Sequence, residues 1–262
     1  MASCPDLVGV PDTLDGQRWS RTLLGVYREG GGTLQALQKE GIGDSDGILQ
    51  PSGTAEARGD AMTTVVSLRG VQIYPGLLSP QMQANLVEDL RACARQAPFF
   101  TPVTASGKAM SVRLTSAGQM GWVSDRRGYR YERRHPSGAE WPAIPDIVLG
   151  LWRDLVSGER DPDCCLINYY GEGTKMGLHQ DRDEADFQWP VLSISLGDEG
   201  LFRVGNTTRG GKTESVWLRS GDVLLMGGDA RLVYHGVDRI RFGSSRLLPQ
   251  GGRINLTCRV VT

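Results

Sequence analysis

Three potential metal ligands, far apart along the chain, place the strongest constraint on how this sequence can fold. One residue separates His179 from Asp181, and His235 lies 54 positions after Asp181. Two imidazoles and one carboxylate are the ligands of a facial triad, which holds Fe(II) and leaves the opposite face of the metal open. Alternate residues of a β-strand point to the same side. The pattern therefore predicts a strand through residues 179–181 and further strands that bring His235 back to it.

The segments around these ligands favour a β-rich fold. The apolar run Cys164–Tyr170 precedes the turn Gly171–Gly173, and both come shortly before His179. Residues 221–228 and 231–236 have the pattern of two short strands joined by a Gly-Asp turn, so we expect His235 to end a strand. A short H-x-D tripeptide also occurs by chance. The flanking strands are what favour a metal site.

A polar strand near the C-terminus predicts the second ligand of the site. Polar and apolar residues alternate from Arg253 to Arg259, which places Arg253, Asn255, Thr257 and Arg259 on one face. Two buried arginines are costly unless an anion neutralises them, and guanidinium groups bind carboxylates with paired hydrogen bonds. A dicarboxylate that also chelates iron, 2-oxoglutarate, fits this requirement and predicts an oxygenase. The alternative is an edge strand whose arginines face solvent.

These segments together resemble the AlkB family, and most closely its bacterial members. The resemblance begins near Val65 and continues to the C-terminus. Its motifs occur in the order Leu166–Tyr170, His179–Glu184, Ser193–Gly197, Gly221–Val223, Arg231–Gly236 and Arg253–Arg259. The family consists of Fe(II)- and 2-oxoglutarate-dependent dioxygenases that remove alkyl lesions from nucleic-acid bases. Several blocks in the right order make this signal far more specific than any single motif.

The resemblance implies a mainly β fold with flanking helices, in which a double-stranded β-helix, or jelly-roll, core follows an N-terminal nucleotide-recognition lid. It implies Fe(II) on His179, Asp181 and His235. It assigns 2-oxoglutarate, with O2 as the second cosubstrate, to Arg253, Arg259, Asn168, Tyr170 and Asn255. The expected reaction removes methyl groups from bases such as 1-methyladenine and 3-methylcytosine, and it releases formaldehyde, succinate and CO2.

A basic segment rich in aromatic residues predicts where the nucleic acid binds. Residues 121–135 contain five arginines, one aspartate, one glutamate and three aromatic residues besides His135, for a charge of +3. Aromatic rings stack on bases and guanidinium groups pair with phosphates. The resemblance implies that Trp122 stacks on the damaged base and that Asp183 reads its exocyclic amine and acts in catalysis. It implies further substrate contacts for Tyr129, Arg182 and Arg209. The alternative is a solvated hairpin with inward-packed aromatics.

One position departs from the family pattern. Met226 stands where bacterial members have a tryptophan near the iron. The three metal ligands are unaffected, but the wall of the pocket is different, so the substrate range is harder to predict than the reaction. His135, the third histidine, is expected at the surface or in the lid.

Charge and composition limit the surroundings in which the chain works. The net charge is −1. Residues 1–60 contribute −4, from nine acidic and five basic side chains, so the rest of the chain carries +3. The sequence has no long apolar run and no recognisable secretory signal, and its five cysteines lack a C-x-x-C motif. We expect free thiols, a cytoplasmic monomer, no membrane contact, and alkylated DNA, single-stranded or with a flipped base, as the partner, with RNA as a further substrate.

The pattern along the chain predicts two regions. Residues 1–60, rich in Gly, Asp and Ser, form a largely irregular extension with at most a short helix near Leu34 to Glu40. Residues 61–262 form the dioxygenase domain, with support helices and the lid in 61–160 and the jelly-roll core in 161–262. Helices are expected after Ser79 and Pro80, and from about Pro145 to Val156.

Two other functions are compatible with parts of this pattern. One is a 2-oxoglutarate oxygenase that acts on a small metabolite or a protein, against which the aromatic and basic segment argues. The other is a non-enzymatic nucleic-acid-binding module with a structural metal. Structural zinc sites usually have four protein ligands and several cysteines, so two histidines and one carboxylate favour catalytic iron.

Overall fold

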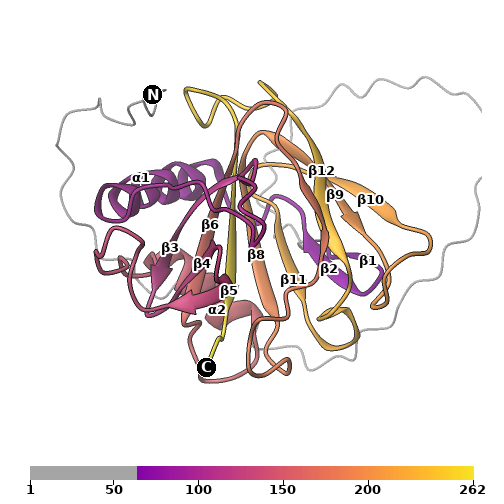
Figure 1. Ribbon diagram of the computed structural model, residues 1–262. Helices are drawn as coiled ribbons and strands as arrows, with labels where there is room; N and C mark the ends of the chain where they lie inside the picture. The colour runs from indigo at the N-terminus through magenta and orange to yellow at the C-terminus, as the bar shows by residue number, and fades with distance from the viewer. Residues whose placement is uncertain (1–63) are drawn as a thin grey trace, which may run out of the picture. The chain divides into compact units, whose positions relative to one another are not determined.

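The computed structural model describes residues 64–262, which form antiparallel β-sheets with two α-helices on one side (Figure 1). The irregular extension predicted for residues 1–60, and its short helix, lie outside the described residues. The helices are α1 (Pro80–Gln96) and α2 (Asp146–Leu155), with a 3-10 turn η1 (Gly228–Ala230). The strands are β1 (Val66–Leu68), β2 (Val71–Tyr74), β3 (Arg113–Gly118), β4 (Gly121–Asp125), β5 (Gly128–Glu132), β6 (Cys164–Tyr170), β7 (Met176–His179), β8 (Val191–Gly197), β9 (Glu199–Val204), β10 (Glu214–Leu218), β11 (Val223–Met226), β12 (His235–Arg241) and β13 (Arg253–Arg259).

Two sheets carry the fold. The larger has seven strands in the order β1-β2-β11-β8-β13-β6-β3, and the smaller has four in the order β10-β9-β12-β7. Strands β4 and β5 form a separate hairpin. This arrangement confirms the mainly β, jelly-roll-like fold with flanking helices. Three strands of the larger sheet, β1 to β3, come from the first part of the domain, so residues before 160 also build the core sheet.

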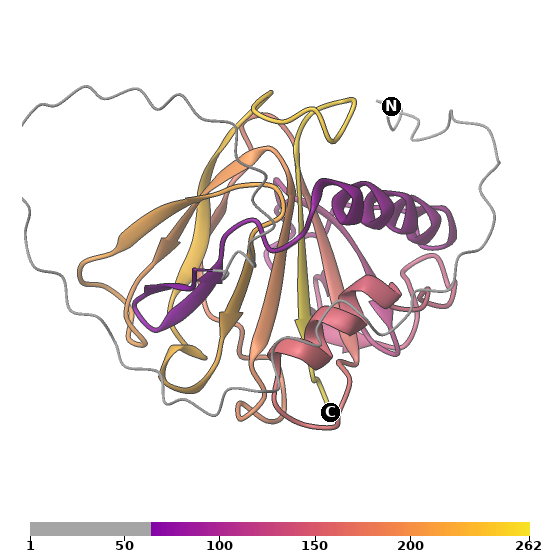
Figure 2. The ribbon, with the colours of Figure 1, turned by 180° about the vertical axis from the view of Figure 1, so that it is seen from behind.

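Both helices form where the sequence predicts them. Ser79 caps α1 by accepting a hydrogen bond from the Met82 backbone N–H at 3.3 Å, and Pro80 occupies the first turn. The apolar side of α1 buries Leu86 and Leu90, and α2 buries Val148, Leu151 and Trp152. Figure 2 shows both helices on the same side of the larger sheet. They cover one face of that sheet and leave the other face available for a site.

Alternation along the central strands separates core from site. Leu192, Ile194 and Leu196 of β8 belong to the apolar cluster that includes both helices. Ser193, between them, faces the opposite side and lines a pocket, as does Asn255 of β13. Because successive residues of a strand point to opposite faces, one strand supplies both the hydrophobic core and the polar lining.

Strand β13 lies in the interior of the larger sheet. It pairs with β8 on one side and β6 on the other, so that Asn255 lies opposite both Ser195 and Asn168. The edge-strand alternative for Arg253 and Arg259 is therefore wrong, and both side chains are buried. Backbone pairing with β6 and β8 fixes the positions of the polar residues on β13 that the sequence places on one face.

The structure differs from the prediction at the strand ends that carry the metal ligands. His179 is the last residue of β7, and Asp181 follows in an irregular segment. His235 begins β12 instead of ending a strand. The residues before it follow the η1 turn, and Tyr234 makes backbone hydrogen bonds to Gly205 and Asn206. In β12, His235 then lies directly opposite His179 of β7.

The cysteines of the described residues lie in the protein interior. Four cysteines, Cys93, Cys164, Cys165 and Cys258, are buried and free, as predicted, and Cys4 lies outside the described residues. Burial raises the pKa of Cys93 to about 11 and that of Cys164 to about 12. Among residues 64–262, no helix is long and apolar enough to cross a membrane.

The packing of β8 against the helices predicts a large loss of stability when its central side chains are shortened. Leu192 is completely buried in the apolar cluster, so Leu192→Ala should lower the free energy of unfolding by about 2–5 kcal/mol. Urea denaturation followed by tryptophan fluorescence measures this change. The control Val66→Ala alters a residue that is 44% exposed and should cost less than about 1 kcal/mol. Equal losses in the two variants would contradict this packing.

Candidate metal and cosubstrate site

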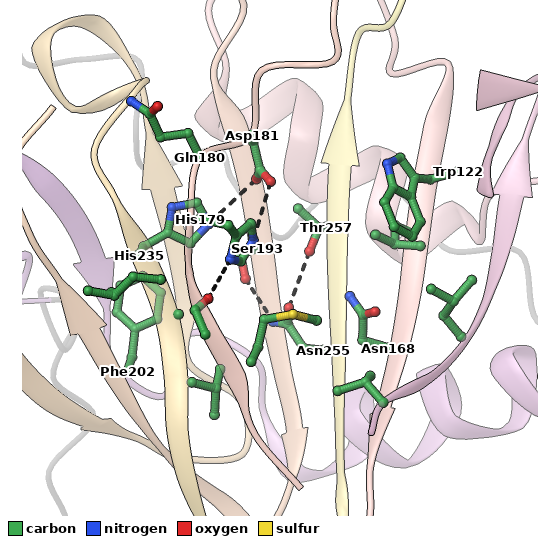
Figure 3. A pocket seen from close by; sticks show the side chains of 18 of the residues that line it. Trp122, Asn168, His179, Gln180, Asp181, Ser193, Phe202, His235, Asn255 and Thr257 are labelled. Atoms are coloured by element: carbon green, nitrogen blue, oxygen red, sulfur yellow. Dashed lines mark hydrogen bonds and ion pairs between the residues drawn. The ribbon is translucent and has the colours of Figure 1, made fainter. Parts of the chain in front are cut away.

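A cavity of about 580 Å³ opens between the two sheets and brings most of the predicted site residues together (Figure 3). The triad candidates, the five residues assigned to 2-oxoglutarate, and four of the five assigned to the substrate line it. These are His179, Asp181, His235, Asn168, Tyr170, Arg253, Asn255, Arg259, Trp122, Tyr129, Arg182 and Asp183. Arg209 is not among the lining residues and lies on the exposed loop between β9 and β10.

The three triad candidates converge on one point. Their ligand atoms all lie within 4.8 Å of one another. Nε2 of His179 lies 3.6 Å from Oδ1 of Asp181, and Nε2 of His235 lies 3.6 Å from Oδ2. In each histidine, Nδ1 is within hydrogen-bond distance of a backbone carbonyl, Gly177 at 2.9 Å and Val233 at 3.0 Å. A proton on Nδ1 satisfies these carbonyls and leaves the Nε2 lone pair directed at the metal position.

The electrostatics of the triad favour the protonation states that metal binding requires. Burial lowers the pKa of His235 to about 4, although Asp181 opposes this shift. Burial alone would raise the pKa of Asp181, but Arg259 and the two histidines hold it well below its usual range. A neutral imidazole and an ionised carboxylate are the forms that bind metal. Oδ2 of Asp181 is buried without a hydrogen-bond partner, as expected of an atom reserved for a cation.

A buried ion cluster lies behind the triad. Arg259 contacts Oδ1 of Asp181 at 2.8 Å and lies 3.4 Å from Glu184. Arg231 pairs with Glu184 at 3.0 Å and donates a hydrogen bond of 2.6 Å to the Asp181 carbonyl. The phenol of Tyr131 donates to Glu184 at 2.6 Å and accepts from Arg259 at 3.0 Å. The cluster thus orients the carboxylate of Asp181 with two cations and a second anion.

The sequence analysis did not assign a role to Glu184 or Arg231. Both side chains are almost fully buried in the cluster. The available signal was their position within otherwise recognisable motifs, because Glu184 follows the ligand segment closely and Arg231 begins an apolar run before His235. Only the folded chain shows that these two residues pair with each other across 47 positions.

Arg253 is a buried cation that lacks an anion of its own. It is 1% exposed, and burial lowers its pKa to about 10. It donates to Ser195 Oγ at 2.7 Å and to the carbonyls of Asp198 and Leu218 at 3.3 and 3.4 Å. No carboxylate lies within ion-pair distance of it among the described residues. A buried charge in this state requires compensation, which a ligand carboxylate would supply.

The unpaired polar atoms of the cavity test whether a metal and a dicarboxylate fit there. Nε of Arg253, Oδ1 of Asn168 and Oδ2 of Asp181 are all buried without hydrogen-bond partners. They belong to three residues that line the same cavity. Buried polar atoms are normally satisfied, so a donor and acceptors left open together indicate a binding site. The residues present therefore fit Fe(II) and 2-oxoglutarate.

The β4–β5 hairpin carries the predicted base-binding residues. The rings of Trp122 and Tyr129 stack, with centroids 5.4 Å apart and planes 20° apart. The indole N–H of Trp122 donates to Oδ2 of Asp183 at 3.1 Å. Tyr131, the cross-strand partner of Trp122, instead packs inward on the ion cluster. One aromatic residue thus follows the inward-packing alternative, while Trp122 and Tyr129 line the cavity.

The positive charge of the hairpin is partly neutralised by its own acids. Arg130 pairs with Asp125 at 2.8 Å and with Glu132 at 2.6 Å. Arg127 also pairs with Asp125, and Arg134 pairs with Glu140. Three of the five arginines in residues 121–135 therefore already have carboxylate partners within the protein. Arg182, by contrast, is an exposed cation that lines the cavity.

Two other residues occupy informative positions. Met226 is 2% exposed and forms part of the cavity wall, as expected for a residue that shapes the pocket. From the sequence, His135 is expected at the surface or in the lid, and its burial excludes the surface position. Its ring nitrogens contact Ser137 Oγ and the Pro98 carbonyl at 2.7 and 2.9 Å, and it packs edge-on against Trp141. Its contacts join the segment after β5 to Pro98, Phe100 and Trp141.

Comparisons with known proteins agree with this geometry. Residues 70–259 match the family model of the 2OG-Fe(II) oxygenase superfamily. The chain is 56% identical over 191 residues to an alpha-ketoglutarate-dependent dioxygenase AlkB homolog of Caulobacter vibrioides, covering 72% of this chain and 87% of the relative. It is 43% identical over 254 residues to the Arabidopsis thaliana protein named DNA N(6)-methyladenine demethylase ALKBH1C, covering 85% of this chain and 55% of that protein.

A solved structure supports the fold independently. The structure of OsALKBH1 superimposes with a TM-score of 0.66 at 30% sequence identity, over 75% of this chain and 99% of that one. The family model extends from residue 70 to residue 259 and so includes strands β2 to β13 and every candidate ligand. The cavity contains a His-Asp-His cluster and a buried arginine without an anion, and the family model and the relatives agree with these features. The chain therefore belongs to the AlkB family of Fe(II)- and 2-oxoglutarate-dependent dioxygenases.

Proposed function

We propose that this enzyme is an oxidative demethylase that repairs N-alkylated bases of the 1-methyladenine and 3-methylcytosine type in DNA, with RNA as a further substrate. The observation that carries this proposal is the Trp122–Asp183 hydrogen bond at the mouth of the cavity that contains the triad. It holds a flat apolar ring beside a carboxylate, the pair of groups needed to stack on a base and to accept a hydrogen bond from its exocyclic amine.

In this proposal His179, Asp181 and His235 hold the Fe(II). When bound, iron with 2-oxoglutarate and O2 supplies the oxidation of the N-methyl group, which yields succinate and CO2 and, after collapse of the hydroxymethyl base, formaldehyde. The residues of the chain orient the ligands. The backbone carbonyls of Gly177 and Val233 fix the two imidazoles, and Arg259 fixes the carboxylate of Asp181.

Arg253 binds one carboxylate of 2-oxoglutarate, and this contact compensates its buried charge. Asn168, Tyr170 and Asn255 complete the polar wall, and burial raises the pKa of Tyr170 to about 12, so its phenol remains a hydrogen-bond donor. Arg259 is shared between the cosubstrate and the ion cluster, since Asp181 and Tyr131 already engage two of its nitrogens. The second carboxylate therefore meets an arginine that is already oriented.

The substrate side of the site combines stacking with charge. Trp122 stacks on the alkylated base, Asp183 reads its exocyclic amine, and Tyr129, Arg182 and Arg209 contact the nucleic-acid backbone. Phe202 lies 5.9 Å from His235 between ring centroids and, with Met226, makes this part of the cavity apolar. An apolar wall excludes water and directs the oxidation to the bound methyl group.

The assignment of the chain as a monomer in the cytoplasm stays a prediction. The small-molecule or protein oxygenase differs from the present proposal in one measurable respect, formaldehyde release from methylated oligonucleotides. No contact in the cavity favours it over a nucleic-acid substrate.

The triad predicts that one carboxylate is indispensable. Asp181→Ala should lower formaldehyde release from a 1-methyladenine oligonucleotide by more than about 1000-fold, because it removes both a metal ligand and the partner of Arg259. The control Asp186→Ala removes an exposed carboxylate from the same segment and should retain near-normal turnover. A near-normal rate in Asp181→Ala would exclude this metal site.

Metal replacement distinguishes an oxygenase from a binding module with a structural metal. Chelation should reduce succinate formation by more than about 100-fold, and Fe(II), but not Zn(II), should restore it, because only a redox-active metal supports the oxidation. Circular dichroism of the chelated protein should show that the fold is retained. Loss of the fold on chelation, reversed by Zn(II), would instead indicate a structural metal.

The hairpin geometry predicts a defect in substrate binding alone. Trp122→Ala should raise the KM for a methylated oligonucleotide by about 5- to 100-fold, the range expected for loss of one base stack. The affinity for 2-oxoglutarate should change by less than about 2-fold, since the side-chain hydrogen bond of Trp122 goes to Asp183 and not to a residue of β13. The control is Trp217→Ala. Trp217 lies on β10, packs against Arg241 of β12 and does not line the cavity. Equal KM changes in the two variants would contradict the stacking role.

A further inference from the structure

Gln180 lies between two metal-ligand candidates, but its side chain leaves the metal site. Figure 3 shows it directed away from Asp181 and His235. Its amide nitrogen donates to the carbonyl of Thr207 at 3.0 Å and to that of Leu232 at 2.5 Å. Two carbonyl acceptors require the nitrogen, not the oxygen, at this position, so the orientation of the amide is determined by its partners.

The two carbonyls belong to segments with different tasks. Leu232 lies three residues before His235, and Thr207 begins the exposed part of the β9–β10 loop. Backbone hydrogen bonds already join these segments, from Tyr234 N–H to Asn206 at 2.9 Å and from Gly205 N–H to Tyr234 at 2.7 Å. Gln180 adds the segment that carries the metal ligands. It therefore ties the loop to the rim of the active-site cavity, which Gln180 itself lines.

The base of this loop is held on its other side as well. Arg69 donates to the side chain of Asn206 at 2.5 Å and pairs with Glu214 at 3.0 Å. Beyond that base, Gly210 and Gly211 adopt φ values of +99° and +80°, which turn the chain sharply. The loop is thus fixed at its base and projects a short tip.

The tip presents charge that the rest of the described chain does not neutralise. Arg209 and Lys212 are exposed, and neither has a carboxylate within ion-pair distance among residues 64–262. Arg182, next to Asp181, is a third exposed cation and lines the cavity. Cations spaced along a rim beside a base-sized cavity suit the phosphates that flank one nucleotide.

We propose that Gln180 is a positioning residue that holds the β9–β10 loop at the rim, so that Arg209 and Lys212 bind the phosphates beside the base in the cavity. The inference rests on the proposed nucleic-acid substrate. It assigns a task to the residue between the ligands that the metal site itself does not use. Its consequence is that the same short segment positions the metal through its neighbours and the nucleic-acid backbone through Gln180.

The metal ligands have separate supports, so a change at Gln180 should act mainly on the loop. The imidazoles are held by the carbonyls of Gly177 and Val233, and Asp181 is held by Arg259. Gln180→Ala leaves all of these interactions in place. It removes only the two hydrogen bonds to Thr207 and Leu232. A defect in the loop should therefore appear with strands that carry the phosphates beside the base, and not with a nucleoside that lacks them.

The test compares kcat/KM for a 1-methyladenine single strand of about 15 nucleotides with that for the nucleoside 1-methyl-2′-deoxyadenosine, a short substrate that has the same base but no phosphate. In Gln180→Ala, the ratio of long to short substrate should fall by about 10- to 150-fold, the range for removal of one charge-assisted hydrogen bond to phosphate. Arg209→Ala should produce a similar fall. The double variant should fall by no more than about 2-fold further, because both changes remove the same interaction.

Gln188→Ala is the matched control. It makes the same chemical change a few residues away, at an exposed side chain that holds no carbonyl of the loop, and should leave the ratio unchanged. The affinity of the metal-free protein for the long strand, measured by fluorescence anisotropy against salt, supplies a readout independent of turnover. The negative slope of log affinity against log salt should become shallower by about 0.7 for each phosphate contact that is lost in Gln180→Ala.

The possible failures are distinct. An unchanged length ratio and salt slope in Gln180→Ala, while the wild type demethylates the long strand, would overturn this inference and leave the proposed function intact. Additive effects of Gln180→Ala and Arg209→Ala would also overturn it, because the two residues would then act separately. A wild type that releases no formaldehyde from the methylated strand would contradict the proposed function itself.

Discussion

The buried pairing of Asp181 with Arg259 is the interaction on which the rest of the site depends. It places a carboxylate at 2.8 Å from a guanidinium in the protein interior, where Arg231 and Glu184 complete a cluster of two positive and two negative groups. A buried ion pair is costly unless further hydrogen bonds satisfy its atoms, and here Tyr131 and the Asp181 carbonyl do so. The cluster leaves one oxygen of Asp181 open toward the metal position.

The same cluster connects the parts of the chain to which we assign different ligands. Tyr131 belongs to the hairpin that carries Trp122, Arg259 belongs to the strand that carries Arg253, and Asp181 lies 3.6 Å from the Nε2 atoms of His179 and His235. The contacts among Tyr131, Arg259 and Asp181 therefore keep the regions proposed for the metal, the cosubstrate and the base next to one another. Gln180 extends this arrangement to the β9–β10 loop, which lies outside the cavity.

Much of this site could be predicted from the chain because its chemistry is local. The alternation from Arg253 to Arg259 predicts one polar face, and β13 shows that face lining the cavity. The spacing of His179 and Asp181 and the helix signals at Ser79 and Pro80 are similarly short-range. Predictions failed where long-range pairing decides. His235 begins β12 because it pairs with His179 and Val204, and His135 is buried because Phe100 and Trp141 pack around it.

The amino-acid sequence by itself determined the ligand types, the family and the mainly β class, since these follow from residue identity, from the alternation within single strands and from the order of the motifs along the chain. Only the tertiary structure decided which charges meet. Glu184 and Arg231 are 47 positions apart and Gln180 and Leu232 are 52 apart, and no local pattern relates them. Sequence likewise indicated a strongly basic hairpin, but folding pairs Arg130 with Asp125 and leaves Arg209 exposed on a different loop. The physical reason is that a charge acts through its distance in space, which the order of residues alone does not specify.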